Sequence, residues 1–326
     1  MAKSFLNKLL LIITTLLYGC GGGGGSTEPE ISPIITPPPP VNNAPECTTT
    51  SLPNTLYCSV KHQNLDREFY VYIPEGVGSS ITFTPLLFNL HGYRRIALDF
   101  LGYSGFQSLA DEDKFLVIYP QGSILPSSGA PHWNDSGWTS ESPADDIDYI
   151  STLIDWAYSE YQINLGRVYA TGKSNGGKMS YHLACNIGYR IAGVASVGGS
   201  MTPNTYSNCN PNQPTSIFHI HGDDDTVVPY DGNWRSTSVP EMMTYWKDYN
   251  NCQVQNIISL PDVNNDGDAG SIYQDSQCLN DVYVELFLME GMGHDWPTDF
   301  NEYDIIAADE IWNFLKQFDI NGKINF

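Results

Sequence analysis

Residues 172 to 176 read Gly-Lys-Ser-Asn-Gly, a G-x-S-x-G pentapeptide. An apolar run, Val168-Tyr169-Ala170, precedes it, and the helix-like stretch 178–183 follows it. This order predicts a strand, a sharp turn and a helix, in which the glycines let the backbone pass closely and the serine oxygen stands above a sheet edge. Ser174 is therefore the candidate nucleophile. A plain glycine-rich turn is the alternative, because two glycines and a serine recur at this spacing by composition alone.

Two later segments supply an acid and a base. The apolar run 217–221 ends in a glycine and three consecutive aspartates, 223–225. The run 282–288 leads into the segment 291–297, Gly-Met-Gly-His-Asp-Trp-Pro. A serine, an acid and a histidine thus follow one another in the order used by α/β-hydrolases, each in a loop after an expected strand.

These three groups predict the chemistry of nucleophilic catalysis. Ser174 would attack, His294 would take its proton as general base, and the acid would hold the imidazole in one tautomer. Asp225 is the expected acid, and its neighbour Asp224 is the alternative.

The rest of the chain favours a doubly wound, mostly parallel α/β sheet. Apolar or alternating runs bounded by Pro or Gly predict strands at 68–73, 86–90, 115–119 and 191–197, and helical periodicity predicts helices at 145–161, 239–249 and 302–318. Strands that alternate with helices indicate a parallel sheet covered on both faces. With no internal repeat, residues 46–326 are expected to form one α/β-hydrolase catalytic domain.

The first residues indicate export. Residues 1–19 carry Lys3, Lys8 and then a short apolar stretch, which is typical of a secretory signal peptide rather than of a membrane span. The sequence Leu-Tyr-Gly at 17–19 precedes Cys20 and is similar to a bacterial lipobox, so Cys20 is the expected lipidation site. An ordinary cleaved signal is the alternative. Residues 20–45, rich in Gly and Pro, predict a linker that holds the domain off the outer membrane or cell surface.

Six further cysteines point to disulfides in an exported protein. An even number of cysteines is what complete disulfide pairing requires. Six cysteines can pair in fifteen ways, and pairing between sequence neighbours is one of them. In sequence order these cysteines are Cys47, Cys58, Cys185, Cys209, Cys252 and Cys278. No C-x-x-C is present, which argues against a zinc or redox site.

Acidic residues dominate the charge. Asp and Glu number 37 against 15 Lys and Arg, giving a formal charge of -22, and such a surface repels nucleic acid and anionic lipid. The segment 262–267 copies the first half of a calcium loop, but its twelfth position is Tyr273 rather than glutamate. A solvated acidic loop is therefore expected there, with no metal.

Four ordered motifs resemble the secreted polyhydroxybutyrate depolymerase and feruloyl esterase family of α/β-hydrolases. They are the segments 90–93, 167–177, 221–230 and 293–297, and the resemblance spans roughly residues 60–318. It implies an extracellular serine carboxylesterase that needs no cofactor and acts on an ester substrate, which can be polymeric. The sequence leaves the acyl group or polymer open.

The resemblance also implies roles for two backbone groups, and the loop positions of two tryptophans suggest a role in binding. The backbone N–H groups of Tyr93 and Asn175 would form the oxyanion hole. Trp133 and Trp296 are the expected substrate-binding aromatics, although Trp133 could equally tuck its own loop. The chain departs from the family at Lys173 and at Arg94-Arg95, so cations are expected to line the mouth of the site.

Two other classes of function stay open. One is a surface-binding module that kept the fold and lost catalysis, and the other is a serine peptidase on the same fold. The intact Ser174, Asp225 and His294 argue against the first, and the lack of an additional substrate-gating domain argues against the second.

Overall fold

The structure is a computed structural model, which describes residues 44–78, 83–267, 269–300 and 303–325. The predicted signal peptide, Cys20 and the linker up to residue 43 lie outside the described residues.

The described residues form one 11-stranded sheet with strand order β1-β2-β3-β5-β4-β8-β9-β10-β13-β12-β11. The strands are β1 (Glu46–Thr49), β2 (Thr55–His62), β3 (Leu65–Tyr72), β4 (Thr84–Leu90), β5 (Leu116–Pro120), β8 (Ile163–Lys173), β9 (Gly193–Val197), β10 (Ser216–Gly222), β11 (Val254–Ser259), β12 (Ser271–Ser276) and β13 (Val284–Met289). The central strands from β5 to β13 pair in parallel, whereas the strands at both edges pair antiparallel. Two short hairpins lie outside the sheet, β6 (Ser123–Leu125) with β7 (Ala130–His132) and β14 (Phe318–Asp319) with β15 (Gly322–Lys323).

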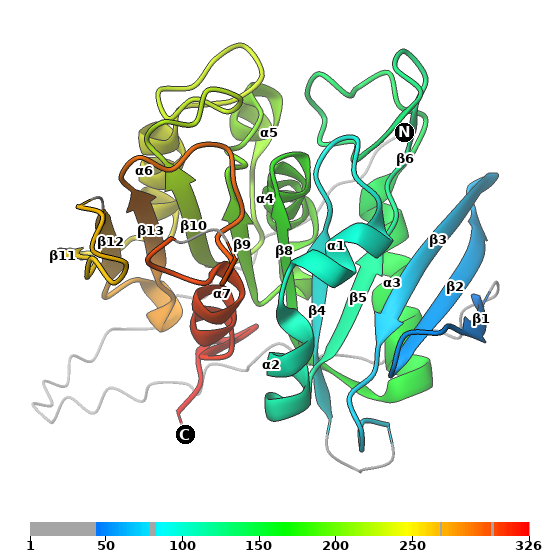
Figure 1. Ribbon diagram of the computed structural model, residues 1–326. Helices are drawn as coiled ribbons and strands as arrows, with labels where there is room; N and C mark the ends of the chain where they lie inside the picture. Colours follow the sequence, from blue (N-terminus) through cyan, green and yellow to red (C-terminus); the bar gives the residue numbers. More distant parts are fainter. Residues whose placement is uncertain (1–43, 79–82, 268, 301–302, 326) are drawn as a thin grey trace, which may run out of the picture. The chain divides into compact units, whose positions relative to one another are not determined.

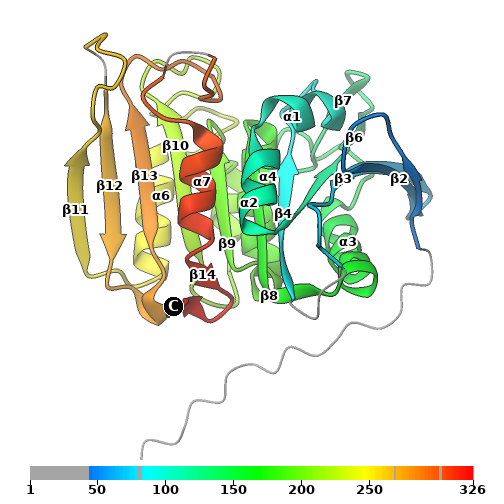
Figure 2. The ribbon, with the colours of Figure 1, turned by 60° about the horizontal axis from the view of Figure 1, so that its bottom comes forward.

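Helices cover both faces of the sheet, as Figures 1 and 2 show. The helices are α1 (Ala97–Tyr103), α2 (Phe106–Asp113), α3 (Asp146–Tyr161), α4 (Asn175–Ile187), α5 (Pro203–Asn208), α6 (Val239–Tyr249) and α7 (Ala307–Leu315). Residues of α3, α4 and α6 share one buried apolar cluster, and residues of α1, α2 and α7 share the other. In the described part of the chain, no helix combines the length and apolar composition that a bilayer span requires.

The predicted α/β-hydrolase fold class is confirmed, and the local predictions differ in accuracy. The helix predicted at 239–249 has the same bounds as α6, and the helix predicted from 145 begins at Asp146 with Asp145 as its N-cap. The helix observed in the region predicted at 302–318 is shorter than predicted: α7 begins at Ala307 and ends at Leu315. The edge strands β1, β2, β11 and β12 were not predicted, since much of their surface is solvent-exposed and apolar runs are missing.

Three disulfides join sequence neighbours among the six cysteines. Cys47 pairs with Cys58 between β1 and β2, and Cys185 on α4 pairs with Cys209 after α5. Cys252 and Cys278 close the excursion that carries β11 and β12. The structure therefore selects neighbour pairing from the connectivities that the sequence left open.

The strand order fixes where a site can form. From β4 the chain winds to β5 on one side, whereas from β8 it winds to β9 on the other. The loops after β4 and β8 thus separate at the carboxyl end of the sheet, where open α/β sheets bind ligands. These are the loops that contain His91-Gly92-Tyr93 and Ser174.

Candidate active site

Ser174 lies on a strained turn between β8 and α4. Its φ is 55° and its ψ is -117°, a backbone conformation that is rare for a residue with a side chain. Gly176 must lack a side chain, because a Cβ there would lie 2.1 Å from the carbonyl oxygen of Leu90 at the end of β4. The Ser174 N–H donates to Val197 O at the end of β9 (2.9 Å). The turn is thus fixed between its neighbouring strands, as a nucleophile elbow requires.

Asp225 and His294 lie in direct contact. The Asp225 Oδ2 atom is 2.6 Å from His294 Nδ1, and its Oδ1 atom accepts the N–H groups of Val227 (2.9 Å) and Val228 (2.8 Å). Burial raises the pKa of the Asp225 carboxyl, but the hydrogen bond and charge of His294, with the two N–H groups, outweigh that effect and leave the pKa below its usual value. A carboxylate held this way can orient the imidazole and stabilise its cation.

The other two aspartates of the run have different surroundings. Asp224 is exposed, and its backbone N–H donates to Met292 O (3.2 Å). Asp223 is also exposed, and its Oδ1 accepts the N–H of Gly291 (2.8 Å). Of the two candidate acids, the structure thus brings Asp225 to His294 and leaves Asp224 facing solvent.

His294 and Ser174 approach the same turn after β9. A Cβ built on Gly198 would lie 3.2 Å from Nδ1 and from Cε1 of His294. Gly198 directly follows Val197, whose carbonyl holds the Ser174 N–H, and its φ of 58° is one that glycine adopts without strain. The candidate nucleophile and the candidate base therefore both lie against the turn at Val197–Gly198.

The predicted oxyanion donors lie on the two loops that separate at the switch point. Asn175 is the first residue of α4, and the first N–H groups of a helix have no acceptor inside the helix. Gly92 lies against the nucleophile, since a Cβ there would be 3.7 Å from Ser174 Cβ. The Gly92–Tyr93 peptide, which carries the Tyr93 N–H, thus borders Ser174.

His91 holds that peptide from the other side. Its Nε2 accepts the Gly122 N–H (2.9 Å), so its proton is on Nδ1, which donates to Gly92 O (2.8 Å). Burial lowers the pKa of His91 to about 4, which keeps the ring neutral near pH 7. The sequence gives no signal for this role of His91, because its partner Gly122 follows a different strand.

Trp133 and Trp296 do not present a surface to substrate. Both rings are fully buried, which corrects the prediction that they bind substrate. The Trp133 indole donates to His91 O (2.9 Å), and its backbone N–H donates to the Asn175 side-chain oxygen (2.7 Å). Trp133 therefore anchors its own loop to the residues beside Ser174. Trp296 packs edge-on against Phe100.

A cavity of about 410 Å³ opens beside these residues. Its wall includes Lys173, directly before Ser174, and Asp295, directly after His294. It is completed by Gly92, Arg95, Asp99, Phe100 and Tyr103. Burial lowers the pKa of Lys173, and the charge of Asp295 partly opposes this effect. Two of the predicted cations, Lys173 and Arg95, thus line the mouth, whereas Arg94 is not part of the cavity wall. Helix α1, which supplies three of the wall residues, was not predicted.

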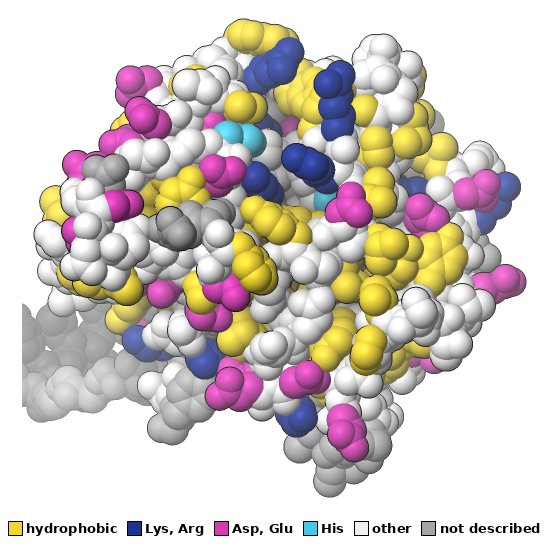
Figure 3. Space-filling view, in the orientation of Figure 1, with side chains coloured by type: hydrophobic (Ala, Val, Ile, Leu, Met, Phe, Trp, Pro, Cys, Tyr) yellow, Lys and Arg dark blue, Asp and Glu magenta, His cyan; other side chains and the backbone are white. Residues whose placement is uncertain are grey.

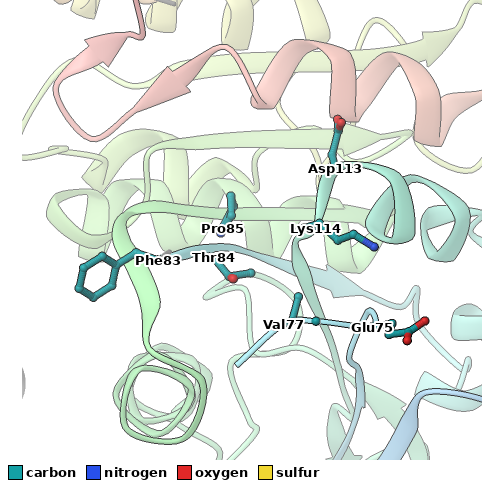
Figure 4. Close-up of a pocket in the computed structure, with 8 residues that line it drawn as sticks. Glu75, Val77, Phe83, Thr84, Pro85, Asp113 and Lys114 are labelled. Atoms are coloured by element: carbon teal, nitrogen blue, oxygen red, sulfur yellow. The ribbon is translucent and has the colours of Figure 1, made fainter. Parts of the chain in front are cut away.

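A second cavity of about 420 Å³ lies away from this site (Figure 4). It surrounds Thr84 and Pro85 at the amino end of β4, opposite to the end that carries Gly92. Asp113, at its rim, accepts hydrogen bonds from Trp312 on α7 (2.6 Å) and from Lys316, the residue that caps the end of α7 (3.1 Å). It contains none of the candidate catalytic groups.

A buried histidine pair supports the loop of the candidate acid. His221 Nε2 donates to Val228 O (2.8 Å), and its Nδ1 lies 3.0 Å from His219 Nε2. Tyr181 on α4 lies 3.0 Å from the remaining nitrogen, Nδ1 of His219. Burial lowers the pKa of both histidines. The sequence carries no signal for this pair, because the partners of the two rings come from other elements.

Side-chain oxygens of the acidic segment 262–267 accept hydrogen bonds from backbone N–H groups of the same loop. Asp262 Oδ2 accepts the Gly267 N–H (3.2 Å), and Asn264 Oδ1 accepts the Asp266 N–H (3.0 Å). Throughout the residues that the structure describes, no group of three or more His, Cys, Asp or Glu side chains is placed to hold a metal ion.

Comparison with known proteins agrees with the fold and with the motifs. Residues 120–257 match the phospholipase/carboxylesterase family model. The chain is 28% identical over 265 residues to the bifunctional acetylxylan esterase/xylanase XynS20E of Neocallimastix patriciarum, covering 81% of this chain and 35% of that protein. It is 28% identical over 262 residues to a probable feruloyl esterase C of Aspergillus terreus, covering 78% of this chain and 85% of that protein.

Two further matches complete the comparison. Poly(3-hydroxyalkanoate) depolymerase C of Paucimonas lemoignei is 25% identical over 71% of this chain and 59% of its own length. The solved acetyl xylan esterase from Aspergillus awamori superposes with a TM-score of 0.56 at 15% identity, over 80% of this chain and 98% of that one. The chain spans less than half the length of several curated relatives that it matches. The chain thus has the α/β-hydrolase fold, and its resemblance to the polyhydroxybutyrate depolymerase and feruloyl esterase family is confirmed by these matches.

Proposed function

We propose that this protein is an exported serine carboxylesterase that cleaves ester bonds of a polyester or of a plant polysaccharide. The observation that carries the proposal is the 2.6 Å contact between Asp225 and His294, beside a strained Ser174 at the switch point of the sheet. The similarity to esterases supports the same reaction class. A binding module without catalysis would have no need to retain this arrangement.

The first half of the reaction acylates the serine. The Ser174 oxygen attacks the ester carbonyl carbon while His294 Nε2 takes the hydroxyl proton, and the carbonyl electrons move onto oxygen. The N–H groups of Tyr93 and Asn175 stabilise that oxyanion. As the tetrahedral intermediate collapses, the C–O bond to the alcohol breaks and His294 returns the proton to the departing alcohol oxygen.

The second half repeats these steps with water. His294 takes a proton from the attacking water, a second oxyanion forms, and its collapse releases the acid and restores Ser174. Throughout, the Asp225 carboxylate keeps the proton of His294 on Nδ1 and stabilises the imidazolium. Every transferred proton passes through His294, so the reaction needs no cofactor.

We expect the full chain to hydrolyse p-nitrophenyl acetate and to act on at least one of methyl ferulate, acetylated xylan and a polyhydroxybutyrate suspension. The cavity of about 410 Å³ beside Ser174 accommodates a short acyl group or an aromatic one. Initial rates on this panel show which class of ester the protein cleaves. A p-nitroanilide amide serves as the control for peptidase activity. Turnover of the amide without turnover of any ester would favour the peptidase alternative.

We propose further that residues 1–19 are a signal peptide, that Cys20 carries a lipid anchor, and that a linker to residue 45 joins the anchor to the catalytic domain, 46–326. Changing Cys20 to Ser should move the protein from the membrane pellet to the soluble exported fraction, because the thiol is the only group that can accept the lipid. Cell fractionation and immunoblotting measure the distribution, with wild type as reference. A variant that stays in the membrane pellet would contradict the lipoprotein proposal.

A further inference from the structure

Basic side chains gather around the candidate site in a strongly acidic protein. The chain has 15 Lys and Arg against 37 Asp and Glu, yet four cations lie near Ser174. Arg94 and Arg95 are on the loop after β4, Lys173 is the last residue of β8, and Arg235 is on the loop after β10. None of the four forms a salt bridge with a carboxylate of the described residues, whereas Arg67, Arg190, Lys247 and Lys316 all do. Figure 3 shows Lys and Arg side chains grouped around a hollow in the upper part of this face, with a histidine beside them.

Two of these arginines belong to a continuous surface feature, which we call the arginine–aromatic ridge. It consists of Arg94, Tyr93, Trp138, Arg235 and Trp234. The Arg94 guanidinium lies 5.2 Å from the Tyr93 ring centre, and the Tyr93 and Trp138 rings meet edge to face at 4.8 Å. The Arg235 guanidinium lies 5.2 Å from the Trp138 ring centre and 4.4 Å from that of Trp234.

The ridge is exposed and begins at the reacting centre. Trp234 is 72% exposed, which is unusual for so large an apolar side chain and is typical of a binding surface. Arg94 and Arg235 are exposed as well. At the other end, the backbone of Tyr93 borders Ser174. A ligand lying along the ridge would therefore lead directly to the candidate nucleophile.

The charge of the ridge differs from that of the cavity. The cavity wall holds Arg95 and Lys173 but also Asp99 and Asp295, and Asp295 accepts a hydrogen bond from Tyr303 (2.8 Å), so its cations are balanced. The ridge arginines contact aromatic rings instead of carboxylates. The unbalanced positive charge thus lies outside the cavity, along the path of a bound chain.

We propose that the ridge binds a polysaccharide that carries carboxylates, with the cleaved ester as one of its substituents. This inference rests on the proposed esterase function. Aromatic rings offer flat apolar faces to sugar rings, and guanidinium groups bind carboxylates through two parallel hydrogen bonds. A neutral aliphatic polyester would gain nothing from the arginines. The remaining surface is acidic, but its repulsion is screened over about 8 Å at physiological ionic strength, so the ridge arginines act on carboxylates that are in contact with them.

Binding by the Ser174→Ala full chain tests the proposal without turnover. The probes are polygalacturonate and its fully methyl-esterified form, which has the same backbone without the charges. We expect Kd to be at least about tenfold lower for polygalacturonate, since each charge-assisted contact contributes about 1.5 kcal/mol or more. The difference should vanish at high salt. Equal affinity for the two polymers, or affinity for neither, overturns the proposal.

Variants assign the binding to the ridge. Adding Arg94→Gln and Arg235→Gln to the Ser174→Ala protein should weaken polygalacturonate binding at least about tenfold. The corresponding Lys substitutions should give an intermediate loss, because lysine keeps the charge but not the bidentate geometry. The matched control is Lys114→Gln, which removes an exposed cation at the remote cavity of Figure 4 and should leave binding unchanged. Undiminished binding in the double arginine variant overturns the assignment.

A separate assay distinguishes failure of this inference from failure of the proposed function. Wild type is assayed in parallel on p-nitrophenyl acetate, which is neutral and carries no carboxylate for the ridge arginines to bind. Turnover of this ester together with equal binding of both polymers would leave the esterase function standing and overturn the inference. Selective polygalacturonate binding without any ester turnover would overturn the function and leave the ridge as a binding site.

Discussion

Replacing Ser174 with Ala is expected to reduce ester turnover by on the order of 10⁶, to near the limit of detection, because loss of the nucleophile removes the covalent pathway. His294→Ala should have an effect of similar size, since the two residues act as a unit and their losses do not add. The measurement is kcat on p-nitrophenyl acetate, with circular dichroism and Tm to confirm that the fold is retained.

A matched serine variant controls for the substitution itself. Ser207 on α5 is exposed, and its hydroxyl donates to Pro203 O within its own helix (2.8 Å). Ser207→Ala should therefore leave kcat unchanged. Undiminished ester turnover in Ser174→Ala would show that another residue is the nucleophile and would remove the basis of the proposed mechanism.

Asp225→Asn is expected to reduce turnover by about 10⁴. The asparagine oxygen can still accept the N–H groups of Val227 and Val228, so the loop should keep its conformation. Its amide NH₂ would then face His294 Nδ1 and favour the tautomer with the proton on Nε2, which cannot accept the Ser174 proton. The effect is thus one on kcat rather than on folding, and Tm measured beside kcat separates the two.

The neighbouring aspartates provide the controls for this prediction. Asp223→Asn and Asp224→Asn should each stay within about tenfold of wild type, because substitutions at exposed sites usually change stability by less than about 0.5 kcal/mol. Asp223 contributes only a hydrogen bond to the Gly291 N–H. A severe loss in Asp224→Asn with near-normal Asp225→Asn would reassign the acid by one residue.

The sequence predicted the centre of the fold well because its signals are local. β4 and β10 are buried along their whole length, and their apolar runs stand out without any knowledge of their neighbours. The turn at Ser174 is likewise encoded by the glycines around it. The edge strands β11 and β12 give weaker signals, since the pairing of β12 with β13 and of β11 with β12, rather than their composition, holds them in place.

The two tryptophans show where a local pattern fails. Trp133 lies in a loop rich in Pro, Ser and Gly, which is the composition of an exposed segment, yet it is buried because its indole reaches His91 O across 42 residues of sequence. Trp138, only five residues further on, is the aromatic of that loop that joins the ridge. Nothing in the loop's sequence distinguishes these two positions.

By itself, the sequence determined the order of the central strands and of helices α3, α4, α6 and α7, the turn at Ser174 and the three loops in which a nucleophile, an acid and a base could lie. Each of these depends on backbone propensities and side-chain periodicity within a few residues. Only the tertiary structure decided that Asp225 rather than Asp224 faces His294, that His219 and His221 form a pair beneath that loop, and that Tyr93, Trp138 and Arg235 form one ridge. These contacts join loops that follow different strands, so they depend on strand order and register, which bring distant segments to one edge of the sheet.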